Sequence, residues 1–141
     1  MKEPATAREF LARALAHDKA GREAKAIPDY ERALKLGLDS ADERTALICL
    51  ASSHRNVGEH LRAQSIIERA RRKFSGDPVV DAFAALILLD AGRPQRAVRI
   101  LGLALCNHAQ PGALDGFDSA LTRKFRAATQ TAAVTGAAGK R

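Results

Sequence analysis

Three stretches of the chain repeat one pattern of small and large residues. Each begins with a glycine, places an alanine five residues later, a large residue nine residues later and a second alanine twelve residues later. Positions spaced by four and then three residues share one face of a helix. The pattern comprises Gly21, Ala26, Tyr30 and Ala33, then Gly58, Ala63, Ile67 and Ala70, and then Gly92, Ala97, Leu101 and Ala104.

A second helical pattern precedes each glycine, so the repeating unit is a pair of helices. A small residue stands seven positions before every glycine, as Ala14, Ala51 and Ala85, which lets two helices approach closely. The glycines are 37 and then 34 residues apart, and the additional three residues fall in the loop LGLDSAD. The sequence therefore predicts helices at about 7–19, 24–36, 41–56, 60–73, 78–91 and 94–106.

Start and stop signals agree with these helices. Capping boxes are predicted at Thr6 with Glu9 and at Ser40 with Glu43, and Asp77 is a cap followed by proline at the first helical position. The glycine after each first helix is expected to end it. Pro28 falls inside the second helix and removes one backbone hydrogen bond, so we expect a local kink there and no break.

The repeat pattern stops after Pro111 and Gly112. Beyond it, four apolar residues recur at intervals of three and four, as Leu114, Phe117, Leu121 and Phe125. This spacing predicts a capping helix at about 113–128, which would cover the apolar flank that the last hairpin of an array leaves open. Residues 129–141 have little to bury, and we expect a flexible tail.

Composition restricts the class of protein. The 141 residues form one domain by length, and no run of about 20 apolar residues could span a bilayer. With no signal-peptide pattern at the N-terminus, we expect a soluble, cytoplasmic protein. Cys49 and Cys106 lack the spacing of a metal site, and we interpret them as reduced thiols. The net charge of +7 favours an acidic partner.

At the small, large and glycine positions quoted above, the chain resembles a tetratricopeptide repeat protein, and it is similar to small stand-alone bacterial members with three repeats. The resemblance implies an all-α fold, a right-handed α-solenoid of three helix-turn-helix hairpins plus a C-terminal capping helix. The single domain would cover residues 1–126, with repeats at about 7–39, 40–76 and 77–110. Phe10 and Leu47 match the family's opening large position, whereas Asp81 departs from it.

The resemblance also implies a partner site. In this family the first helix of each pair lines a concave groove that takes a peptide or a helix of a partner protein. The groove positions here would include Leu11, Leu15, Ile48, Ser52, Arg55, Asn56, Ala82, Phe83, Leu86 and Leu89. Apolar residues stand where some members carry a polar clamp for a terminal carboxylate. We therefore expect an apolar strand or an amphipathic helix as the ligand, oriented by Arg55 and Asn56.

Other functions compete with partner binding. The same surface could serve homo-oligomerisation, as in a homodimer, or only core packing. The basic run Arg69, Arg71, Arg72 and Lys73 could contact nucleic acid, but it ends a predicted helix and few aromatic residues are available for stacking. His17 and His54 hold the same repeat position, and we expect both to be half-buried and hydrogen-bonded. No catalytic, cofactor-binding or metal-binding pattern is found, so the prediction is a non-enzymatic interaction module.

Overall fold

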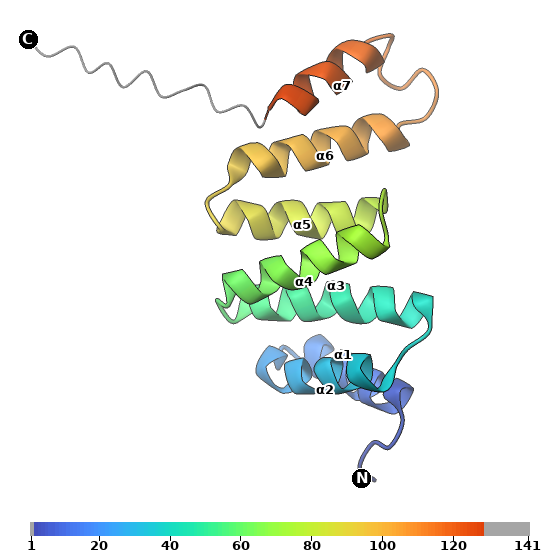
Figure 1. Cartoon of the computed structure of the whole chain (residues 1–141), viewed down its shortest axis with the longest axis vertical. Helices are drawn as coiled ribbons and strands as arrows, with labels where there is room; N and C mark the ends of the chain where they lie inside the picture. The colour runs from blue at the N-terminus through green and yellow to red at the C-terminus, as the bar shows by residue number, and fades with distance from the viewer. Residues whose placement is uncertain (1, 129–141) are drawn as a thin grey trace, which may run out of the picture.

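The computed structural model describes residues 2–128, which form seven α-helices. Three hairpins are made by α1 (Ala7–Lys19) with α2 (Glu23–Leu36), α3 (Ser40–Asn56) with α4 (His60–Lys73), and α5 (Pro78–Asp90) with α6 (Pro94–His108), and α7 (Asp118–Ala127) follows. The hairpins stack in chain order along the long axis, with α7 at the far end (Figure 1). The predicted α-solenoid is confirmed.

The first helix of each hairpin begins at a side-chain cap, and two of these three caps are as predicted. The Thr6 hydroxyl accepts from the Glu9 amide at 3.2 Å, and the Glu9 carboxylate accepts from the Thr6 amide at 3.1 Å, which is a complete capping box. Asp77 caps α5 as expected. The prediction that Ser40 caps the third helix was wrong. The Asp39 carboxylate accepts from the Asp42 amide at 2.9 Å, so the helix begins one residue earlier than a Ser40 cap allows.

Each hairpin turn is closed by its glycine. Gly21, Gly58 and Gly92 have φ of 68°, 82° and 71°, a region that side chains with a Cβ rarely adopt. The amide after each glycine donates to a carbonyl five residues back, over 2.8–2.9 Å. In all three hairpins this hydrogen bond pairs a carbonyl group at the end of the first helix. Pro28 does not interrupt α2; it is exposed, so water can satisfy the carbonyl that its missing N–H leaves free.

The repeated small and large residues form the core. Ala14, Ala51, Ala63 and Ile67 are completely or almost completely buried, and so is the large residue of the first repeat, Tyr30. The equivalent residue of the third repeat differs, because Leu101 is 46% exposed. No fourth hairpin follows within the described residues, so only α7 is left to cover this flank of α6.

The array curves toward the side on which the first helix of each hairpin lies. Along the stack, the backbone of α3 lies close to those of α1 and α5, whereas the backbones of α2, α4 and α6 do not approach one another among the described residues. Helices that are closer together lie on the inside of a curve. We therefore call α1, α3 and α5 the inner helices and α2, α4 and α6 the outer helices.

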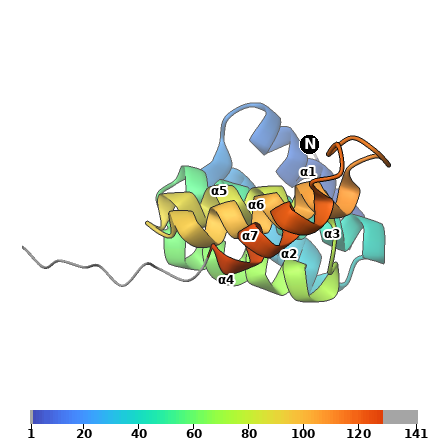
Figure 2. The same cartoon turned by 90° about the horizontal axis from the view of Figure 1, so that it is seen from above.

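The seventh helix is present but shorter than predicted. It begins at Asp118, because Gly112, Asp115 and Gly116 all have positive φ and turn the chain before it. Phe117, which was expected on its apolar face, is 62% exposed. The helix lies across α6 in both views (Figures 1 and 2) and places the Phe125 ring on Gly102, where an added Cβ would lie 2.0 Å from the ring. The tail predicted at 129–141 lies outside the described residues.

Candidate functional site on the inner helices

The inner helices present corresponding positions of the three repeats to one side. Counted back from each glycine, positions 13, 9, 6 and 2 recur at helical spacing and leave side chains exposed or half-buried, with one helix contributing one row. The rows are Arg8, Ala12, Leu15 and Lys19 on α1, Thr45, Cys49, Ser52 and Asn56 on α3, and Val79, Phe83, Leu86 and Asp90 on α5. We call this surface the inner face. The first row carries one large apolar residue, Leu15, and the third row carries three, Val79, Phe83 and Leu86, whereas the middle row has no large apolar residue.

The predicted groove residues divide into three groups in the structure. Leu15, Leu86 and Leu89 are exposed by 37%, 42% and 54%, and Asn56 is exposed as well. The half-buried residues are Ser52, Arg55, Ala82 and Phe83. Leu11 and Ile48 are buried in the core, at 5% and 6% exposure. Both stand ten positions before the glycine, one residue around the helix from the inner face, and they pack against neighbouring helices.

The two predicted orienting residues already have intramolecular partners. Arg55 on α3 forms an ion pair and a hydrogen bond with Asp90 on α5. Asn56 donates to the Glu23 carboxylate over a long 3.4 Å. Arg55 therefore ties two inner helices together, and its charge is balanced by a carboxylate on the same side of the protein.

A polar network that the sequence analysis missed joins the first two hairpins. The Asp18 carboxylate accepts hydrogen bonds from the Tyr30 hydroxyl at 2.5 Å and from the Ser53 hydroxyl at 2.8 Å. Burial, together with the Asp18 carboxylate, raises the pKa of the Tyr30 hydroxyl. Burial also raises the pKa of the neighbouring Cys49 thiol, so the thiolate needed for nucleophilic chemistry is disfavoured.

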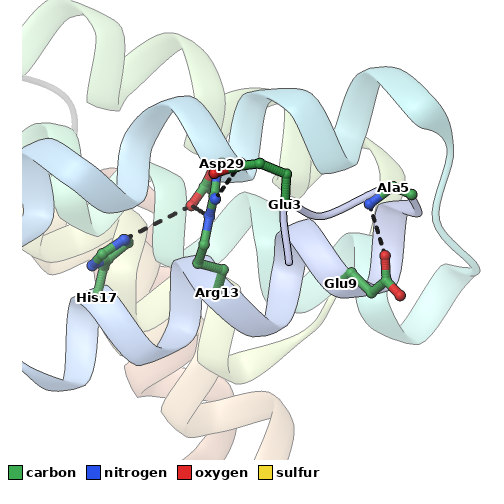
Figure 3. Close-up of polar contacts among 6 residues, drawn as sticks. All are labelled: Glu3, Ala5, Glu9, Arg13, His17 and Asp29. Atoms are coloured by element: carbon green, nitrogen blue, oxygen red, sulfur yellow. Dashed lines mark hydrogen bonds and ion pairs between the residues drawn. The ribbon is translucent and has the colours of Figure 1, made fainter. Parts of the chain in front are cut away.

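A second missed cluster lies between α1 and α2 (Figure 3). Arg13 donates from Nε and Nη2 to the two carboxylate oxygens of buried Asp29, both at 2.7 Å, and from Nη1 to Glu3 at 2.9 Å. These hydrogen bonds raise the pKa of the Arg13 guanidinium. The guanidinium also lies 5.6 Å from the centre of the Phe10 ring. Arg13 and His17 help to line a cavity of about 560 Å³ between the N-terminal segment and α1.

The two equivalent histidines have different surroundings. His17 is half-buried, as expected, and its Nδ1 accepts from Arg22 Nε at 3.2 Å. His54 is fully buried, so the expectation of a half-buried ring was wrong there; its Nδ1 lies 2.5 Å from the Glu59 carboxylate. His54 lies against the hairpin that precedes it, with its Nε2 3.9 Å from Glu31 on α2, whereas His17 lies in the first hairpin and has no earlier hairpin beside it within the described residues. Within residues 2–128, no group of three or more His, Cys, Asp or Glu residues is arranged to hold a metal ion.

The basic run on α4 is largely engaged within the protein. Arg69 and Lys73 both pair with Glu43 on α3. Arg71 pairs with Asp81 on α5 at 3.0 Å, and Arg72 is exposed. Most of this run therefore connects α4 to its neighbours.

Comparison with known proteins agrees with this architecture. The profile described as Tetratrico peptide repeat matches residues 7–111, so the chain belongs to the tetratricopeptide repeat family. No curated protein and no solved structure matches the chain. Membership of this family indicates a protein–protein interaction scaffold, a class that is in general non-enzymatic. Among the described helices, none combines the length and the apolar character that a bilayer crossing requires.

Proposed function

We propose that the inner face holds a segment of a partner protein, either an apolar strand or an amphipathic helix. The observation that carries the proposal is the exposure of large apolar side chains at both ends of this face, Leu15 on α1 and Val79 and Leu86 on α5. Exposed apolar residues that gather on one face favour an interaction, because covering them removes apolar surface from water.

The spacing of the inner helices sets the pattern expected of the ligand. Packed helices have axes about 8–10 Å apart, so two steps from α1 to α5 span about 16–20 Å. An extended strand covers that distance in about five or six residues, and a helix in about 11–13 residues. The partner segment would carry apolar residues at its two ends, facing Leu15 and Leu86, and a small or polar residue in the middle, facing Ser52.

The test is a pull-down from the native host with the double variant Leu15→Asp/Leu86→Asp. Two carboxylates on the apolar ends of the face should lower affinity for an apolar segment about 100-fold or more, because a charge would be buried without a partner. The matched control is Leu36→Asp/Leu61→Asp, which adds the same two charges at exposed leucines of α2 and α4. Recovery that is equal for both double variants would refute the proposal.

Self-association through the same face is the alternative occupant. Light scattering on the purified chain distinguishes it, because a dimer that the Leu15→Asp/Leu86→Asp variant converts to a monomer would identify a second copy as the ligand. A monomeric wild-type chain that recovers a partner only when Leu15 and Leu86 are intact would support the binding of another protein.

A further inference from the structure

A second candidate site lies on the outer helices. A cavity of about 320 Å³ opens between α4 and α6, beside the loop that leads into α5. It forms on the convex side of the array, where the backbones of α4 and α6 stay apart and the side chains of Arg96 and Glu68 bridge them. The imidazole of His108 at the end of α6 lies 3.0 Å from the Gly76 carbonyl and holds the loop at the cavity's edge. The cavity has the size of small-ligand sites in proteins.

The cavity gathers three arginines and fewer carboxylates to balance them. Arg71 pairs with Asp81 at 3.0 Å and lies 3.7 Å from Glu68. Arg96 lies 3.5 Å from the other oxygen of Glu68, which is long for a hydrogen bond, and that buried oxygen has no hydrogen-bond partner in the described part of the chain. Two carboxylates thus face three guanidinium groups, of which Arg99 is the third.

Arg99 carries the unbalanced charge. No ion pair joins it to a carboxylate within residues 2–128. Its Nε is buried and finds no acceptor among those residues. The buried Nε is closed to a ligand as well as to water, so a ligand in the cavity would meet the Nη groups of Arg99. The two Nη groups of a planar guanidinium are suited to bind a carboxylate through two parallel hydrogen bonds.

We infer that this cavity binds a small organic carboxylate with a short apolar portion, its carboxylate on Arg99. One uncompensated positive charge matches a monoanion better than a dianionic phosphate. The apolar portion would lie on Ile100 and Leu103, the apolar part of the lining, and Asn107 at the rim can donate a further hydrogen bond. The site uses the outer helices, so it is independent of the partner-binding role proposed for the inner face.

The experiment is a titration of the ¹⁵N-labelled full chain, followed by amide chemical shifts. Hexanoate is the probe, at constant ionic strength and up to about 10 mM, a range that detects millimolar dissociation constants. Shifts are expected at Gly76, Leu103 and Asn107, which line the cavity. Hexanol lacks the charge and inorganic phosphate lacks the apolar portion, so both should bind at least about ten-fold more weakly.

Arg99→Gln should weaken hexanoate binding at least about ten-fold, because the charged pair of hydrogen bonds is lost. Arg72→Gln is the matched control, since it removes one exposed positive charge from α4 outside the cavity and should leave the dissociation constant unchanged. Arg99→Lys keeps the charge but not the paired donors and should fall between wild type and Arg99→Gln. The unliganded spectra of the variants report whether the fold is intact.

Three outcomes would overturn the inference. The first is the absence of shifts at the cavity residues of the wild-type chain. The second is hexanoate binding that Arg99→Gln leaves unchanged, which would place the ligand elsewhere. The third is phosphate binding at these residues as tightly as hexanoate, which would make the cavity a general anion site instead of a carboxylate site.

Discussion

Changing Asp77 to Asn should destabilise the protein at neutral pH through the loss of one charge. The Asp77 carboxylate accepts from Arg44 Nε at 2.5 Å and from Arg44 Nη2 at 3.0 Å, and it also caps α5 through the amides of Val79 and Val80. Asparagine is an equally good helix cap. The substitution therefore removes the charged pair between α3 and α5 while it retains the cap.

The magnitude follows from the titration of the carboxylate. The Arg44 guanidinium, aided by the two amides, lowers the pKa of Asp77 from 3.8 to about 2. A difference of about two units corresponds to roughly 2.5 kcal/mol, and partial exposure of the pair reduces the expected loss to about 1–2 kcal/mol. Because the folded-state pKa is the lower one, this stabilisation is complete above the unfolded-state pKa. It is lost as the pH falls toward 2, with about half remaining near pH 3.

Urea unfolding followed by circular dichroism, at several pH values between 7 and 2.5, measures the difference between wild type and Asp77→Asn. Asp39→Asn is the matched control, because Asp39 also caps a helix but forms no ion pair within the described residues. The difference for Asp77→Asn should narrow as the pH falls, and that for Asp39→Asn should be small throughout. An Asp77→Asn variant as stable as wild type at pH 7, or a deficit that does not change with pH, would refute the reasoning.

Three further substitutions test the packing and the turns. Gly102→Ala should displace α7 and destabilise the chain by about 1–3 kcal/mol, and the added change Phe125→Ala should recover part of the loss; hydrogen exchange of the α7 amides would report this. Asp29→Asn should lower the melting temperature more than the exposed Glu3→Gln does, because Asp29 is the buried acceptor of Arg13; equal melting temperatures would contradict that role. Gly58→Ala should cost about 1–2 kcal/mol in urea unfolding through its φ of 82° alone, since no atom lies within 4 Å of the added Cβ.

The repeat pattern predicted the hairpins well because the first helix of each pair carries a local signal at both ends, a capping residue and a turn glycine. Capping residues and turn glycines act within four or five residues, so the sequence alone locates them. The seventh helix was harder to delimit. Leu114 has helical spacing with Leu121, but the turns at Asp115 and Gly116 separate it from the helix and leave Phe117 exposed at the N-cap; spacing alone does not reveal a turn.

The candidate site was predicted less completely, because exposure depends on the rotation of each helix against its neighbours. One residue is a rotation of about 100°, which is enough to take Leu11 from the inner face into the core. The missed Arg13–Asp29 pair did have a signal in the sequence. The equivalent positions are Leu50 and Ile66 in the second repeat, so two polar residues replace an apolar pair in the first. Comparing the repeats position by position would have found it.

Gly102 bears on how long the array can be. The equivalent residues of the earlier repeats are Glu31 and Glu68, and each faces the hairpin that follows: Glu31 lies 3.9 Å from His54, and Glu68 lies 3.5 Å from Arg96. In the third repeat the glutamate is replaced by a residue without a side chain, and an aromatic ring occupies the space. A glycine at this position therefore lets α7 end the array. To lengthen the solenoid, Gly102 would be changed to glutamate and α7 would be replaced with a copy of one of the hairpins.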